Sequence, residues 1–257
     1  MQINKFKKIG KNKYKIIFDN TDITLYEDII LKYNLLIKKE LDEYLLDKII
    51  NENLYYDAYD KALGYIEIKL RTKVEIEEYL NKKGFDEKIK EYVIEKLESS
   101  GLLNNEIYTN AYINDKINLS LDGPFKIKND LIKLGIDENI VDKYLNKIDY
   151  DIWKEKIDKI INKKKSSMNN KSYYMFINKL KNELYNKGYE KELIEEKLSK
   201  INYESNAIIK DMEKSVKKYK NDKNKIISYL IRKGYSYEEI KNKLNIEEEL
   251  WKRKDLH

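Results

Sequence analysis

The sequence predicts a mainly all-α protein, in which tandem three-helix repeats form an elongated, curved array behind a small N-terminal β-hairpin and helix segment. Three observations predict this fold class. Apolar residues recur at helical spacing along most of the chain, the 257 residues include only one proline and eight glycines, and a pattern centred on four of those glycines is repeated. A β-sandwich or barrel needs many turns, and therefore more glycine and proline.

Five aligned positions define the repeat. Its glycines recur at intervals of about 50 residues, a spacing typical of stacked helical units, and they are Gly84, Gly135, Gly188 and Gly234. Apolar residues stand four positions before each glycine (Leu80, Leu131, Leu184, Leu230) and eight before it (Ile76, Ile127, Leu180, Ile226). Others stand one position after it (Phe85, Ile136, Tyr189, Tyr235) and ten after it (Ile94, Leu145, Leu198, Leu244).

The second copy shows how each repeat is built. Gly123 suits a helix N-cap and Pro124 the first helical position, where the missing N–H costs nothing. Gly135 can adopt the left-handed conformation that ends a helix, and Asp137 with Glu138 begins the next one at the positive end of its dipole. Each repeat is therefore expected to contain three short helices, none of which is stable alone.

We divide the chain into an N-terminal segment and four repeats, which cover residues 1–52, 53–101, 102–149, 150–202 and 203–257. In the N-terminal segment, apolar and polar residues alternate on both sides of Gly10-Lys11-Asn12, and this pattern predicts a β-hairpin. We expect a short third strand at 23–25, followed by helices over 27–33 and 38–52. We expect it to dock on the first repeat.

Local signals place the helices of the repeats. First helices are expected over 55–70 and 105–119, and a polar loop over 163–170. Capping boxes are expected at Thr72/Glu75 and Ser236/Glu239. Single caps are expected at Asp86 and Asp222, and Trp251 is expected to pack the last helix.

The composition argues against an enzyme. Cysteine is absent, and the one histidine is the last residue, His257, so the usual nucleophile, base and transition-metal sites cannot be assembled. No glycine-rich phosphate loop occurs. Adjacent glutamates, as at Glu77-Glu78, Glu195-Glu196 and Glu238-Glu239, suit pairing with lysines on a solvated helix face. We expect no catalysis, cofactor or metal.

No signal peptide and no apolar run of membrane-spanning length is present. We therefore expect a cytoplasmic protein without a membrane partner.

The charge is unevenly distributed. Residues 27–60 carry nine acids and four lysines, whereas residues 153–188 carry ten lysines and three acids. The basic segment could bind a phosphate backbone or an acidic protein face. An ordinary solvated surface with no binding role explains the lysines equally well. The candidate partner-binding residues are Arg71, Lys116, Lys126, Lys128, Lys133, Lys163, Lys164 and Lys165. Tyrosines that could stack on unpaired bases, or pack at the edge of the core, are Tyr79, Tyr92, Tyr112, Tyr173 and Tyr174.

Two copies of the repeat carry a more specific pattern. In the second copy it consists of Gly123-Pro124 with Leu131 and 135–138, preceded by 101–106 with Tyr108. In the first copy the matching residues are Tyr59, Ala62, Leu63, Tyr65, Arg71, Thr72, Glu75, Ile76, Leu80, Lys83, Gly84 and Phe85. Through these residues the sequence resembles the RecX family, the bacterial regulators of the RecA recombinase.

The resemblance implies a monomeric, non-enzymatic protein that lies in the groove of the RecA–DNA filament and modulates ATP hydrolysis and strand exchange, most simply by inhibition. It departs from the shorter family members through a fourth repeat and an N-terminal segment. Two other functions stay open. One is direct binding of single- or double-stranded DNA, and the other is a general protein scaffold, which the period near 50 residues disfavours.

Overall fold

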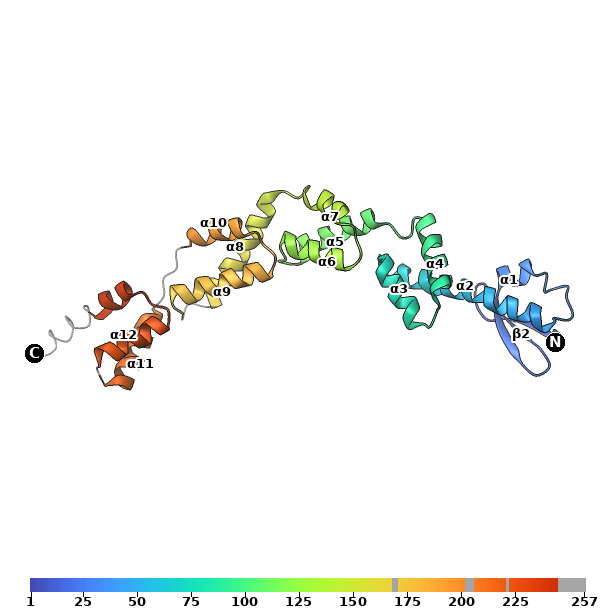
Figure 1. Cartoon of the computed structure of the whole chain (residues 1–257), viewed down its shortest axis with the longest axis horizontal. Coiled ribbons are helices and arrows are strands. Elements are labelled where there is room, and N and C mark those ends of the chain that lie inside the picture. Colours follow the sequence, from blue (N-terminus) through green and yellow to red (C-terminus); the bar gives the residue numbers. More distant parts are fainter. Residues whose placement is uncertain (168–170, 202–205, 221, 245–257) are drawn as a thin grey trace, which may run out of the picture. The chain divides into compact units, whose positions relative to one another are not determined.

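The computed structural model describes residues 1–167, 171–201, 206–220 and 222–244. They form two compact units. One comprises Met1–Asn110 with Ile132–Ile140, and the other comprises Ala111–Leu131 with the described residues from Val141 onward. Helices dominate both units, and the only sheet within the described ranges lies at the N-terminus (Figure 1). The predicted mainly helical repeat fold is therefore confirmed.

The N-terminal segment is a three-stranded antiparallel sheet in the order β1 (Lys5–Lys8), β2 (Lys13–Ile17), β3 (Asp22–Tyr26). The predicted hairpin and third strand are both confirmed. One face of the sheet packs on α1 (Glu27–Lys32) and on the first half of α2 (Glu43–Ile68). Their shared core includes Ile16, Leu25, Ile29, Leu35, Leu41 and Ile49.

The expectation of separate helices over 38–52 and 55–70 is wrong, because α2 runs unbroken for 26 residues. No proline or glycine interrupts residues 43–63, so nothing in this stretch ends a helix. The helix also serves two cores. Leu46 and Ile49 pack under the sheet, and Ala58 and Ala62 pack in the first repeat. The division that we expected at 52/53 therefore falls inside α2.

Polar contacts fix the sheet to the same helix. The Asn53 side chain accepts the Tyr26 N–H at 2.9 Å and donates to the Thr24 carbonyl at 3.1 Å. The Tyr26 hydroxyl donates to Asp60 at 3.0 Å and lies 3.2 Å from Asp57. Burial and these two carboxylates raise the pKa of Tyr26 above its ordinary value. The N-terminal segment is thus docked on the helix that opens the first repeat.

Gly64 offers a test of the continuous helix. It is exposed inside α2, and a Cβ at this position would meet nothing within 4 Å. Alanine costs less backbone entropy than glycine in a helix interior, so Gly64→Ala should raise the free energy of unfolding by about 0.5–1 kcal/mol. Urea unfolding followed by circular dichroism measures the change. A loss of stability would contradict a helix through residue 64.

Each repeat contains three helices, as expected. The first repeat uses the end of α2 with α3 (Lys73–Lys82) and α4 (Glu87–Ser99). The second has α5 (Asn105–Leu119), α6 (Pro124–Lys133) and α7 (Glu138–Leu145), and the third has α8 (Tyr150–Ser167), α9 (Tyr173–Asn186) and α10 (Lys191–Ser199). The fourth has α11 (Ala207–Tyr219), α12 (Lys223–Arg232) and helical backbone over 237–244.

One loop was predicted wrongly. Residues 163–167 belong to α8, because lysine favours the helix and no breaker precedes them, while 168–170 lie outside the described residues. The predicted caps are confirmed at Thr72/Glu75, Ser236/Glu239, Asp86 and Asp222. Trp251 and His257 lie outside the described residues.

The repeated pattern is structural. The four repeat glycines have φ between +79° and +84°, the left-handed region that favours glycine. The apolar residues four and eight positions before them are at most 2% exposed in all four copies. Sequence periodicity therefore located both the helix ends and the core.

Candidate partner-binding surface

The repeat glycines do more than end helices. In the second unit, the start of α6 lies against the turn that follows α9. The Gly123 N–H donates to the Lys187 carbonyl at 2.6 Å, and the Phe125 N–H donates to the Gly188 carbonyl at 3.0 Å. A Cβ added at Gly188 would lie 2.3 Å from the Lys126 nitrogen, and one at Gly123 would lie 2.5 Å from the Gly188 oxygen. Only glycine at both positions permits this approach.

The same arrangement occurs between the third and fourth repeats. The Ser172 hydroxyl, which caps α9 and is 2% exposed, donates to the Lys233 carbonyl at 2.7 Å. A Cβ at Gly234 would lie 2.8 Å from the Ser172 Oγ. In the first unit, a Cβ at Gly135 would lie 2.6 Å from Cγ2 of Val74, the second residue of α3. The second helix of each of the first three repeats thus begins against the glycine turn of the following repeat, and we call these contacts the glycine junctions.

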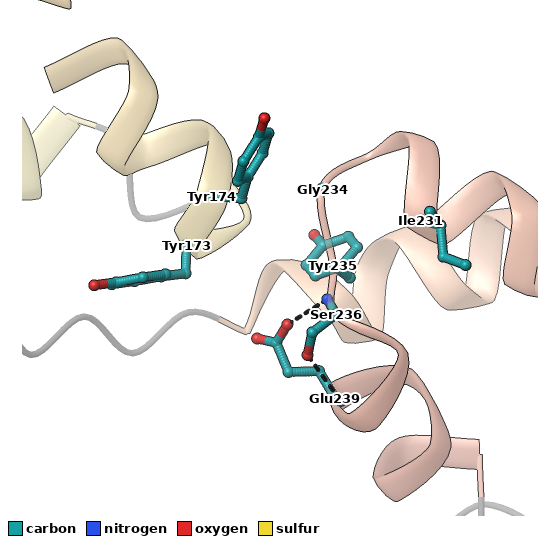
Figure 2. A pocket seen from close by; sticks show the side chains of 7 residues that line it. All are labelled: Tyr173, Tyr174, Ile231, Gly234, Tyr235, Ser236 and Glu239. Atoms are coloured by element: carbon teal, nitrogen blue, oxygen red, sulfur yellow. Dashed lines mark hydrogen bonds between the residues drawn. The ribbon is translucent and has the colours of Figure 1, made fainter. Parts of the chain in front are cut away.

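The junction at Gly234 leaves a groove of about 690 Å³. Tyr173 and Tyr174 project from the first turn of α9, and Gly234, Tyr235 and Ser236 form the turn beside them (Figure 2). The Glu239 carboxylate accepts the Ser236 N–H at 2.7 Å, so its charge is used to cap the next helix. Exposed aromatic rings in a hollow can receive a flat or apolar group.

A charged cluster lies where α5 passes to α6. The Asp122 carboxylate is nearly buried and forms ion pairs with Lys126 at 2.8 Å and Lys116 at 3.1 Å. Burial alone would raise the pKa of Asp122, but hydrogen bonds from the two lysines outweigh it and lower that pKa. Lys116 also lies 3.6 Å from Asp130, whose carboxylate accepts the Tyr112 hydroxyl at 3.3 Å. These cations therefore hold the repeat together.

Lys156 lies next to this cluster and is the most buried lysine among the described residues. It is 3% exposed, and its Nζ donates to the Ser120 carbonyl at 2.6 Å and to the Lys116 carbonyl at 3.1 Å. Its ammonium thus binds carbonyls at the C-terminal end of α5, where the helix dipole is negative. Burial, with the charge of Lys159, lowers the pKa of Lys156.

Arg71 lies inside the first repeat. Its guanidinium lies 3.7 Å from the centre of the Tyr65 ring, and it donates to the Tyr65 carbonyl and to Glu75, both at 3.3 Å. The side chain is 10% exposed. Tyr79 stacks on Tyr65 with ring centres 4.2 Å apart. Arg71 and Tyr79 are therefore held by packing within the repeat.

The remaining candidate cations separate into two groups. Lys128 pairs with Asp142 at 2.7 Å, and Lys164 pairs with Glu183. Lys133 and Lys163 are exposed and Lys165 is half-buried, and these three form no ion pair within the described part of the chain. The structure therefore brings Lys116 and Lys126 together and leaves Lys133 and Lys163 open to solvent.

The candidate tyrosines separate in the same way. Tyr112 is tied to Asp130, and Tyr92 packs edge-on against Tyr55 with ring centres 5.1 Å apart. Tyr173 and Tyr174 are 43% and 63% exposed. Only the last two, at the groove, present a large ring area to a partner.

Comparisons with known proteins establish the family. Residues 58–97, which run from α2 to α4, match the family model described as RecX, first three-helix domain. A protein named Regulatory protein RecX from Streptococcus agalactiae serotype V is 30% identical over 259 residues, covering 95% of this chain and 98% of the relative. The chain belongs to the RecX family.

Other members agree with this assignment. RecX of Lactococcus lactis subsp. lactis is 35% identical over 155 residues, and the alignment covers 60% of this chain and 57% of that protein. A crystal structure of regulatory protein RecX matches with a TM-score of 0.63 over 76% of this chain and 98% of that one, and at 24% identity it supports the fold. RecX from Lactobacillus salivarius matches with a TM-score of 0.52 and 31% identity over 57% of this chain and 97% of that one.

Two features of this RecX family chain were not predicted from the sequence. Lys156 follows Trp153 by three positions and precedes Ile160 by four, so helical spacing places it on the buried face of α8. That spacing could have identified it. The partners of Gly123 and Ser172, at Lys187 and Lys233, left no local signal because each lies more than 60 residues away.

The described residues offer neither a metal site nor a membrane-spanning helix. No group of three or more His, Cys, Asp or Glu side chains is arranged there to hold a metal ion. Within the same part of the chain, no helix combines the length and apolar character that crossing a membrane requires.

Proposed function

We propose that this RecX family chain is a non-enzymatic regulator of the RecA recombinase in DNA repair and recombination. In this proposal it acts in the cytoplasm as a monomer, binds in the groove of the RecA–DNA filament, and inhibits ATP hydrolysis and strand exchange. The single observation that carries the proposal is the match to a regulatory protein RecX over 95% of this chain and 98% of that relative.

Repeated units suit a repeated partner. The four repeats place equivalent helices and turns along one chain, and a filament presents equivalent protomers along its groove. Contacts spread over several repeats require no catalytic cluster. A net charge of +6 favours approach to a nucleoprotein filament.

The cations best suited to a filament are Lys133, near the end of α6, and Lys163, in the last turns of α8. Both are exposed and form no ion pair within the described ranges, so binding would not require breaking an internal contact. Arg71, Lys116, Lys126, Lys128 and Lys164 already hold carboxylates of their own repeats. We therefore narrow the partner-binding candidates to Lys133 of α6 and to Lys163 of α8, with Lys165 two residues after Lys163.

Charge reversal tests each of the two lysines separately. Lys133→Glu and Lys163→Glu should each weaken binding to a RecA filament on single-stranded DNA by about tenfold, because each reversal replaces an attraction by a repulsion. Fluorescence anisotropy with labelled protein measures the affinity at moderate salt. Thermal stability should be unchanged.

Lys217→Glu is the matched control, since Lys217 is an exposed lysine of α11 without an ion pair among the described residues. Equal weakening by all three variants would indicate general electrostatic attraction and would contradict a specific role for Lys133 and Lys163.

A second candidate function is direct binding of nucleic acid. It is favoured by Tyr173 and Tyr174, whose exposed rings lie in the segment 153–188 with its excess of lysines. It predicts binding to bare single-stranded DNA that falls steeply with salt and is lost in Tyr173→Ala with Tyr174→Ala. Strong filament binding with no affinity for bare DNA would exclude it.

A further inference from the structure

The glycine turn of the first repeat differs from the other three. Gly84 has the same left-handed conformation, with φ +83°, but a Cβ built on it would meet nothing within 4 Å. At Gly135, Gly188 and Gly234, the corresponding Cβ would lie within 2.8 Å of the helix start of the preceding repeat. Gly84 is exposed. The first repeat therefore presents the surface that the later repeats use at their junctions, and none of the described residues is docked on it.

The internal junctions define what this surface accepts. Three times in this chain, the ligand is the first turn of an α-helix. The docked helices begin at Thr72, Gly123 and Ser172, which are small and uncharged N-cap residues. At two junctions a donor from the helix start binds the carbonyl of the lysine before the glycine, Lys187 or Lys233.

Lys83 occupies the same position before Gly84. Its carbonyl lies at the C-terminal end of α3, where the carbonyls carry the negative end of the helix dipole. A helix N-terminus, with its unpaired N–H groups, is the complementary element. The turn around Gly84 thus has both the shape and the polarity that the internal junctions use.

A second copy of this chain fits the surface poorly. Its fourth repeat supplies one further second helix, α12, which begins at Asp222. The Asp222 carboxylate accepts the Lys225 N–H at 3.2 Å and would be placed against the carbonyls at the end of α3. The negative carboxylate and the partly negative carbonyls would repel each other. The three internal junctions avoid this repulsion because their N-cap residues are uncharged. The partner must therefore supply a helix start of its own.

We propose that the turn around Gly84 is a docking surface for the first turn of an α-helix of the RecA protomer, one that begins with Gly, Ser or Thr. This inference rests on the proposed function. It assigns a contact to the first repeat that is separate from the lysines of α6 and α8.

The test uses the intact chain with Gly84→Asn. Asparagine tolerates the left-handed conformation better than other side chains, so the fold is kept while a side chain is placed where the partner helix would approach. Gly101→Asn is the matched control, because Gly101 has φ +72° and also meets nothing within 4 Å, but is not a repeat glycine. Binding to a RecA filament on single-stranded DNA is measured by anisotropy, and melting temperatures are compared.

We expect Gly84→Asn to weaken filament binding at least tenfold and Gly101→Asn to leave it within twofold, with similar melting temperatures. Unchanged binding of Gly84→Asn would overturn the docking surface while the proposed function stands. Failure of the unaltered chain to bind the filament would overturn both.

A second measurement does not depend on whether the fold tolerates a substitution at Gly84. The chain has no cysteine, so Asn81→Cys, at an exposed position of the last turn of α3, can carry one photo-crosslinker. Ser99→Cys, at an exposed position of the last turn of α4, is the control. The Asn81 label should link to the start of a RecA helix in the filament and the Ser99 label should not. Linkage of the Asn81 label to another kind of segment, or to no RecA residue, would overturn the inference.

Discussion

Gly188→Ala is expected to lower the free energy of unfolding by about 2–4 kcal/mol. One part, about 1 kcal/mol, arises because alanine is strained at φ +79°. The larger part arises because the new Cβ would lie 2.3 Å from the Lys126 nitrogen and 2.7 Å from its Cβ. Backbone atoms cannot yield as a flexible side chain can, so the start of α6 must move away and lose its two hydrogen bonds to the turn.

Urea unfolding of the full chain measures this effect, and two variants separate its causes. Gly101→Ala carries the conformational strain without the clash, and should cost about 1 kcal/mol. Gly123→Ala carries a clash, since its Cβ would lie 2.5 Å from the Gly188 oxygen, and it should destabilise strongly. Equal small losses for Gly188→Ala and Gly101→Ala would contradict the glycine junction.

The second large effect is expected at Lys156. Lys156→Met keeps the length and apolar stem of the side chain but removes the buried ammonium that donates to the Lys116 and Ser120 carbonyls. The Lys116 carbonyl keeps the Ser120 N–H and hydroxyl as donors, whereas the Ser120 carbonyl loses its Lys156 donor. Loss of these charge-assisted hydrogen bonds should lower the free energy of unfolding by about 1–3 kcal/mol. Lys159→Met, on the exposed side of the same helix, should change stability by less than about 0.5 kcal/mol.

The pH dependence gives Lys156 a separate signature. Its pKa is lower in the folded protein than in the unfolded chain, so the unfolded chain binds its proton more tightly. The contribution of Lys156 to stability therefore rises with pH between the lowered folded-state pKa and the ordinary value of 10.5. The difference between wild type and Lys156→Met should grow over that window. A constant difference would show that the amine does not titrate in the buried site.

The sequence predicted those features that depend on neighbouring residues. Repeat glycines, capping residues and the apolar positions around Ile127 and Leu131 follow from helix periodicity and end chemistry, and the structure confirms them. The family resemblance is confirmed as well. Helix α2 was misjudged as two helices, over 38–52 and 55–70, whereas contacts with the sheet on one half and with the first repeat on the other accompany a single continuous helix.

The candidate surface was less predictable for a physical reason. A lysine looks the same in sequence whether it is free or paired, and its state depends on where a distant carboxylate lies. Lys164 and Lys128 have partners 19 and 14 positions away, at Glu183 and Asp142. Lys163, beside Lys164, has none within the described residues. Only the folded arrangement distinguishes these neighbours.

RecA's ATP hydrolysis on single-stranded DNA tests the central claim most directly. RecA from the same organism is assembled on the DNA, and this RecX family chain is added at ratios well below one per RecA at moderate salt. The account predicts a marked fall in the hydrolysis rate, weakened by Lys133→Glu and Lys163→Glu. An unchanged rate at every ratio, with the chain bound to bare DNA in parallel, would contradict it.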